Sequence, residues 1–293
     1  MERIPRLAGI PMIKVSCFNK MGDLVYALPV LRALHRTRGE KIHLLTSGSC
    51  WQFAPLLWEQ PYIAEVELDE SQAHATVPIH RGAIFPGWEF YTPQEGINLS
   101  LQPAYFSETA PVSWTCCYMQ AAGIDELTDS DCVALPTLVN HRRWLYGIDV
   151  FSNGKPIPPP NTFLIAPETD TLDEIMPSTW QSIIDQIVEA GHDVMVVGTR
   201  RFSSFERCLD LRGQTSVPVL SRLIAECRGF IGAHSFPWHL ARHSETPAVC
   251  LQTWREGLRR CLPIDTPYTW VEPMDWPHAV KTVLQSTLTE VSA

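Results

Sequence analysis

The chain has 293 residues, of which 45% are hydrophobic and 19% charged, a composition that is typical of globular proteins and unlike that of disordered chains. The formal net charge of −9 argues against a broad nucleic-acid-binding surface, and no apolar run approaches the roughly 20 residues of a membrane span. The N-terminus lacks a signal-peptide pattern, and the nine cysteines form no Cys-x-x-Cys pair. We therefore expect a cytoplasmic protein that is long enough for two domains.

The first βαβ pattern lies near the N-terminus. We expect a strand over residues 12–18, a helix over about 24–37 with leucines on one face, and a second strand over 41–46. The loop between the first strand and the helix contains Gly22 and Asp23. Because ligands of parallel α/β sheets bind beyond the carboxyl ends of the strands, this loop is a candidate binding site.

The sequence from residue 48 to 145 gives weaker signals. Short strands are predicted at 66–68 and 83–85. The stretch 88–114 is rich in aromatic, proline and polar residues, and we expect it to form a long, ordered and partly irregular loop region on the ligand side of the domain.

A proline-dense segment near mid-chain is typical of a spacer between domains. We therefore predict an N-terminal Rossmann-like domain over residues 1–152, a linker over 153–161 and a C-terminal Rossmann-like domain over 162–276. Residues 277–293 are predicted to form a terminal helix, which could pack back on the first domain.

The second half repeats the alternation of strands and helices. Its predicted strands are short and apolar, as strands buried on both faces are, and its helices carry apolar residues at three- and four-residue spacing. The predicted strands cover 162–166, 193–197, 230–231 and 248–251, and the predicted helices cover 178–190, 219–227, 237–243 and 277–289. The sequence thus predicts an α/β protein of two doubly wound domains that face each other across a ligand cleft.

Asp23 has two interpretations. An aspartate beside the start of a helix is a favoured N-cap residue. A carboxylate at the lip of a cleft can instead act as a general base toward a substrate hydroxyl. Sequence reasoning on this segment by itself leaves both open.

The segment 230–241 predicts a strand, a glycine-containing loop and a helix. Ser235 can cap this helix, and Pro237 suits its first turn. The amides and dipole of such a helix N-terminus form an anion site that suits a diphosphate. The alternative is an ordinary capped helix in which Trp238 and His239 are packing residues.

Two further turns follow predicted strands of the second half. One contains Thr169 and the other Gly198 and Thr199. Hydroxyl residues at the carboxyl ends of strands can bind phosphate oxygens, whereas the simpler interpretation is turn formation.

Several motifs are absent from the sequence, namely the dinucleotide-binding and P-loop glycine patterns and the nucleophile elbow of the hydrolases. The His239-x-x-x-His243 pair has no obvious third ligand in the sequence. We therefore predict neither a metal site nor a cofactor.

Four segments in order resemble the lipopolysaccharide heptosyltransferases, glycosyltransferase family nine. Residues 14–34 are similar to that family's opening strand, Gly-Asp turn and Leu-Pro-x-Leu-Arg-x-Leu helix. Residues 211–225 resemble its Leu-x-Gly-x-Thr-Ser element, and residues 232–241 resemble its Gly-Asn-Asp-Ser-Gly-Pro-Met-His-Leu-Ala segment. Residues 246–249, Thr-Pro-Ala-Val, follow where the family has a Thr-Pro strand element.

The resemblance implies a GT-B fold and an inverting, metal-independent transfer of sugar from a nucleotide-diphosphate sugar to a hydroxyl of a glycan, glycolipid or other acceptor. It implies that Asp23 is the catalytic base, with Lys20, Met21 and Gly22 on the acceptor side. The donor and its diphosphate would be bound by the second half, through Thr169, Gly198, Thr199, His234, Ser235, Phe236, Trp238 and His239.

Some residues depart from the family pattern. His234 stands at an acidic position, Phe236 at a glycine, and Glu174 where a lysine is expected. A protonated His234 could compensate for that lysine. The changes at Glu174 and His234 support one alternative, a degenerate, non-catalytic protein that binds a sugar nucleotide or a partner protein. A second alternative is a sugar-nucleotide epimerase of the same fold, which would need further carboxylates and histidines in the cleft.

Overall fold

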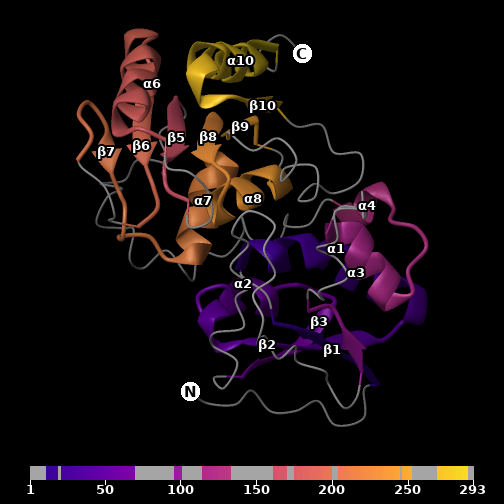
Figure 1. The fold of residues 1–293 in the computed structure, drawn as a ribbon. Coiled ribbons are helices and arrows are strands. Elements are labelled where there is room, and N and C mark those ends of the chain that lie inside the picture. The colour runs from indigo at the N-terminus through magenta and orange to yellow at the C-terminus, as the bar shows by residue number, and fades with distance from the viewer. Residues whose placement is uncertain are drawn as a thin grey trace, which may run out of the picture.

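The computed structural model describes residues 11–18, 21–69, 96–100, 114–132, 161–169, 175–199, 204–244, 246–252 and 269–289. Two separate β-sheets form the centres of two α/β domains (Figure 1). Every strand pair in both sheets is parallel. Parallel sheets need crossover connections, which agrees with the predicted alternation of strands and helices.

The first sheet has four strands in the order β3-β2-β1-β4. Its strands are β1 Met12–Cys17, β2 Lys41–Ser47, β3 Ile63–Asp69 and β4 Ile97–Asn98. The accompanying helices are α1 Met21–Arg38, the short helices η1 Gly48–Cys50 and α2 Ala54–Trp58, then α3 Trp114–Ala122 and α4 Asp129–Cys132. Helices α3 and α4 pack on α1.

The second sheet has six strands in the order β10-β9-β8-β5-β6-β7. Its strands are β5 Thr162–Ala166, β6 Asp193–Val196, β7 Leu209–Asp210, β8 Gly229–Ala233, β9 Ala248–Leu251 and β10 Thr269–Val271. Its helices are α6 Pro177–Glu189, α7 Val217–Glu226, α8 Phe236–His243, η6 Pro273–Asp275 and α10 Trp276–Thr289.

Helix α6 shows how the sequence determines these elements. Pro177 stands in its first turn, where a missing N–H costs nothing. Its apolar residues Trp180, Ile183, Ile184 and Ile187 are buried on one face. The helix ends before Gly191, whose φ of 87° is the left-handed conformation that glycine adopts readily.

Helix α1 begins at Met21, earlier than the sequence predicted, so Asp23 lies within its first turn. Pro29 lies inside the helix without ending it. Both neighbours of Pro29, Leu28 and Val30, are buried to 1% exposure or less. We attribute the continuity of the helix to this packing, because burial can outweigh the backbone cost of an internal proline.

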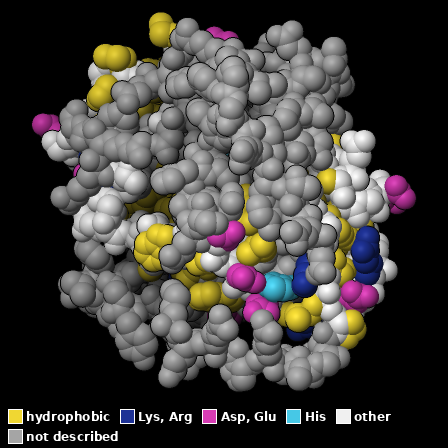
Figure 2. Space-filling view, turned by 60° about the horizontal axis from the view of Figure 1, so that its bottom comes forward, with side chains coloured by type: hydrophobic (Ala, Val, Ile, Leu, Met, Phe, Trp, Pro, Cys, Tyr) yellow, Lys and Arg dark blue, Asp and Glu magenta, His cyan; other side chains and the backbone are white. Residues whose placement is uncertain are grey.

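The two faces of the first sheet differ in character. Ile13 and Val15 point into the core beneath α1, whereas Lys14 points to the other face and is exposed. On that outer face His43 Nε2 lies 3.1 Å from a carboxylate oxygen of Glu67. Figure 2 views the molecule from this side and shows acidic, basic and histidine side chains close together.

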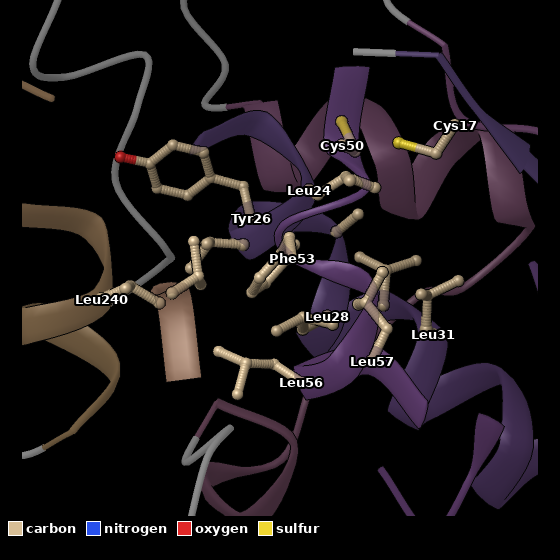
Figure 3. Close-up of a cluster of buried hydrophobic side chains, with 14 of the residues drawn as sticks. Cys17, Leu24, Tyr26, Leu28, Leu31, Cys50, Phe53, Leu56, Leu57 and Leu240 are labelled. Carbon is tan, nitrogen blue, oxygen red and sulfur yellow. The ribbon is translucent and has the colours of Figure 1, made fainter. Parts of the chain in front are cut away.

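A continuous hydrophobic core joins the two domains. Phe53 of the first domain packs edge-on against Phe236 of the second, with ring centroids 5.4 Å apart. Leu240 of α8 belongs to the same buried cluster as Phe53, Leu56 and Leu28 of the first domain (Figure 3). Helix α1 also packs on α8, and α2 on α7.

Helix α10 packs on β8 and β9 and on α6, at the far side of the second sheet from the first domain (Figure 1). The buried residues Ala279, Val280 and Val283 of this helix belong to the core of the second sheet. The return of the C-terminal segment to the first domain stays a prediction. No helix in the described ranges is long and apolar enough to cross a membrane.

Candidate functional site

Each sheet contains a position at which the chain reverses its direction of winding. In the second sheet β5 has β6 on one side and β8 on the other, and in the first sheet β1 lies between β2 and β4. Ligands of open α/β sheets bind beyond the carboxyl ends of the strands at such positions. The loops that follow β1 and β8 lead into α1 and α8, the two segments that the sequence singled out.

Hydrogen bonds join the loops at both positions. The Thr169 hydroxyl, after β5, donates to the carbonyl oxygen of His234, after β8, at 3.0 Å. The Phe18 amide, after β1, donates to the hydroxyl of Ser100, after β4, at 3.1 Å. The Thr169 hydroxyl thus has a partner within the chain at the point where it was predicted to bind phosphate.

The start of α1 lies against α8 of the other domain. A Cβ atom at Gly22 would lie 2.8 Å from Cδ2 and 3.2 Å from Nε2 of the His239 ring. Only a glycine allows this approach without a shift of one partner. Met21, Gly22 and Asp23 are all partly buried there, and Asp23 stands in the first turn, where its charge is favourable to the helix dipole.

Helix α8 begins without a side-chain cap. Ser235 occupies the N-cap position in an extended conformation, but its hydroxyl donates to the carbonyl oxygen of Ala233 at 3.2 Å. The prediction that Ser235 caps the helix is therefore wrong, because its hydroxyl is directed back toward β8. The first residues of α8, Phe236 and Pro237, follow without this cap.

Tyr26 and His239 link the two domains by a buried hydrogen bond between Tyr26 Oη and His239 Nδ1. The two residues are only 2% and 6% exposed. Their rings meet edge-on at 4.7 Å between centroids, and the rings of His234 and Trp238 lie 4.8 Å and 5.2 Å from that of His239. The His239 ring is thus held from several sides.

His234 is neutral in this environment. Its Nε2 atom is buried and has no hydrogen-bond partner among the described residues. Burial lowers the pKa of His234 from 6.5 to about 4. The hypothesis that a protonated His234 supplies a missing positive charge is therefore wrong at neutral pH.

The turn after β6 is built around a carboxylate. The Thr199 amide and hydroxyl both donate to Oε2 of Glu168, and Gly198 adopts a φ of 129° beside it. Arg212, which is 2% exposed, lies 3.8 Å from the other Glu168 oxygen. Asp210 accepts hydrogen bonds from the Arg212 guanidinium at 3.0 and 2.8 Å. These hydrogen bonds raise the pKa of Arg212.

No protein-family model and no curated protein sequence matches the chain. Solved structures do match it. A glycosyl transferase of family 9 from Veillonella parvula is 13% identical with a TM-score of 0.64, over 94% of this chain and 97% of that one. The ADP-heptose LPS heptosyltransferase II of E. coli is 13% identical with a TM-score of 0.63, over 96% and 100%.

The chain has the fold of the family-nine glycosyltransferases. The predicted GT-B class of two Rossmann-like domains is confirmed. A third match is TibC of enterotoxigenic E. coli, a dodecameric, iron-containing heptosyltransferase in complex with ADP-D-β-D-heptose, at 15% identity and a TM-score of 0.59, over 92% of this chain and 64% of that one. In the described part of this chain, no three His, Cys, Asp or Glu side chains are placed to hold a metal ion.

Within this glycosyltransferase fold the structure brings the predicted acceptor-side and donor-side segments together at the contact of α1 with α8. Phe236 is half-buried against Phe53, and Trp238 is 1% exposed, so both contribute packing. Lys20 and Glu174 lie outside the described residues.

Sequence reasoning missed Tyr26, Glu168 and Arg212. Tyr26 gave a usable signal, because a tyrosine on the buried face of a predicted helix needs a partner for its hydroxyl. Glu168 and Arg212 gave none, since only the fold brings the ends of β5, β6 and β7 to one edge of the sheet.

Proposed function

We propose that the protein is an inverting glycosyltransferase that moves a sugar from a nucleotide-diphosphate sugar to an acceptor hydroxyl. The observation that supports this most is the contact of α1 with α8. It brings Gly22, the residue before Asp23, against His239 in the N-terminal half of a helix from the opposite domain. The fold supports the same class.

In this proposal Asp23 is the general base. Its carboxylate takes the proton of the acceptor hydroxyl as the oxygen attacks the anomeric carbon, and the bond from that carbon to the diphosphate breaks on the opposite face. Gly22 and Met21, with Lys20 before them, border the acceptor. The configuration at the anomeric carbon inverts in this single displacement.

In this proposal the donor diphosphate binds at the start of α8. Negative charge on the leaving diphosphate grows as the glycosidic bond breaks, so a helix N-terminus directed at it stabilises the transition state more than the ground state. At this end of α8 the backbone N–H of Phe236 would face the diphosphate, since Pro237 has no N–H and the amides of Trp238 and His239 donate to the Ser235 carbonyl oxygen. The Ser235 hydroxyl does not compete for that amide, because it bonds to Ala233. A neutral His234 adds a hydrogen-bonding group but no charge there.

The substrates follow by analogy with the structural neighbours. The names of two of them carry ADP-heptose, so an ADP-sugar is our first choice of donor. We propose a glycan or glycolipid hydroxyl as the acceptor, of the lipopolysaccharide-core type, the cytoplasm as the compartment, and a reaction that needs no metal.

The experiment is a transfer assay over a panel of nucleotide sugars, with ADP-, UDP- and GDP-sugars offered alongside truncated glycolipid acceptors. Release of the nucleoside diphosphate together with a product one sugar heavier supports the proposal, and an inverted anomeric signal in the product supports the stereochemistry. The proposal is refuted if the protein binds none of the nucleotide sugars and turns none of them over.

A second candidate is a sugar-nucleotide-binding protein without transfer activity. Two observations favour it: the neutral state of His234, and the hydrogen bonds that the Thr199 amide and hydroxyl donate to Glu168. Tight binding of one nucleotide sugar with no turnover on any acceptor is the result that this candidate predicts.

A further inference from the structure

The turn after β6 has the chemistry of an anion site. It offers a backbone amide and a hydroxyl from Thr199, the open backbone of Gly198 at positive φ, and the buried guanidinium of Arg212 nearby. Amides in such turns, together with arginine, are the groups with which proteins bind phosphate.

The anion in this turn is the chain's own Glu168. Its carboxylate accepts both hydrogen bonds of Thr199, and the side chain is 10% exposed. A Cβ atom at Gly198 would lie 2.9 Å from Glu168 Oε2, so the turn is shaped closely around the carboxylate. A phosphate at Thr199 would therefore have to displace Glu168 or lie against its negative charge.

A purely structural role for Glu168 as the partner of Arg212 does not account for this geometry. Asp210 already holds Arg212 by two hydrogen bonds from the guanidinium, whereas Glu168 is 3.8 Å away from it. Oε2 of Glu168 instead accepts hydrogen bonds from the amide and the hydroxyl of Thr199. The side chain is thus directed at the turn rather than at the arginine.

We propose that Glu168 is a specificity-determining residue, which excludes phosphate groups from the turn at residues 198–199 and so leaves the start of α8 as the place for the donor diphosphate. The identity of the ligand rests on the proposed function; the exclusion of phosphate does not. A donor that reaches this turn must meet Glu168 with hydrogen-bond donors, such as ribose hydroxyls or a base amino group.

The test is binding of inorganic phosphate to the full chain, followed by calorimetry and by the amide resonance of Thr199 in ¹⁵N-threonine-labelled protein. Glu168→Ala should bind phosphate about tenfold or more tightly than the wild type, because one like charge is removed from the turn. The Thr199 resonance should shift with phosphate in the variant alone. In the Glu168→Ala background, Thr199→Val should remove most of the gain.

Glu189→Ala is the matched control. It removes the same charge from an exposed position on α6, where the side chain is 70% exposed, and should leave phosphate binding unchanged. Equal binding in wild type and Glu168→Ala, or an equal gain in Glu189→Ala, overturns the proposal. If Glu168→Ala fails to fold, Glu168→Gln tests the same point, since its amide oxygen can still accept from Thr199 while the charge is gone.

The outcomes separate this proposal from the proposed function. Phosphate binding needs no turnover, so exclusion can be established even if no sugar is transferred. Conversely, a working transferase whose Glu168→Ala variant gains no phosphate affinity keeps its proposed function and loses only this inference.

Discussion

Replacing Gly22 with alanine tests the contact between the domains. The added Cβ would lie 2.8 Å from Cδ2 of His239, closer than the van der Waals distance. The His239 ring cannot move aside freely, since Tyr26 binds it and the ring of His234 lies against it. Overpacking of this kind costs about 1–3 kcal/mol. Alanine returns about 1 kcal/mol through its helix preference, so the net loss is about 0–2 kcal/mol.

The assay is urea unfolding of the wild type, Gly22→Ala, His239→Ala and the double variant. Once the imidazole is gone, Gly22→Ala should be neutral or slightly stabilising, which gives a coupling energy of about 1–3 kcal/mol between the two positions. If Gly22→Ala costs the same in both backgrounds, the two residues do not touch, and the argument that α1 and α8 meet here is refuted.

Two other predictions concern the same cluster. Tyr26→Phe should lower the free energy of unfolding by about 1–3 kcal/mol, because it leaves His239 Nδ1 without its buried partner; Tyr62→Phe is the control and should cost nothing, since the buried Tyr62 hydroxyl has no partner among the described residues. The pKa of His234 lies below its unfolded value of 6.5, so between pH 6.5 and about 4 the unfolded chain binds more protons than the folded chain. The folded protein therefore has its full stability above pH 6.5 and loses stability as the pH falls from 6.5 toward about 4. Urea unfolding at pH 7.5 and pH 5 should show a loss of about 2 kcal/mol that His234→Asn abolishes; an equal loss in this variant would assign the pH dependence to other groups.

The sequence predicted the elements whose burial follows a simple pattern. Strand β5 and helix α6 were located within a residue or so, because an apolar run between turn residues and a one-sided apolar helix are local signals. The predicted strand at 66–68 is the centre of β3. The predicted strand at 83–85 lies outside the described residues.

The elements that escaped prediction depend on partners far along the chain. Strand β4 consists of Ile97 and Asn98 and exists through its pairing with Val15 and Ser16 of β1. Strands as short as this have no periodicity of their own. Helix α3 begins at Trp114, the last residue of the stretch predicted as loop, and was not predicted. Its short run of apolar residues does not distinguish a buried helix from other buried structure.

The sequence predicted the segments of the candidate site but not the partners of their side chains. The Gly22-Asp23 turn and the start of α8 follow from their places after strands β1 and β8, and from the resemblance to a known family. Tyr26 and His239 are 213 residues apart in sequence, and no local rule pairs them. The hydrogen-bond partner of Thr199 is likewise Glu168, which follows a different strand and lies 31 residues earlier in the sequence.

The measurement that tests the central claim most directly is the turnover of Asp23→Asn beside its affinity for the donor. If Asp23 is the base, turnover should fall by roughly 10²–10⁴-fold while the donor dissociation constant changes little. Glu40→Gln, which neutralises a carboxylate just beyond the other end of α1, should leave both unchanged. If Asp23 only stabilises helix α1 by interacting with its dipole, Asp23→Asn will lower the melting temperature slightly and leave turnover intact. That result would contradict the account.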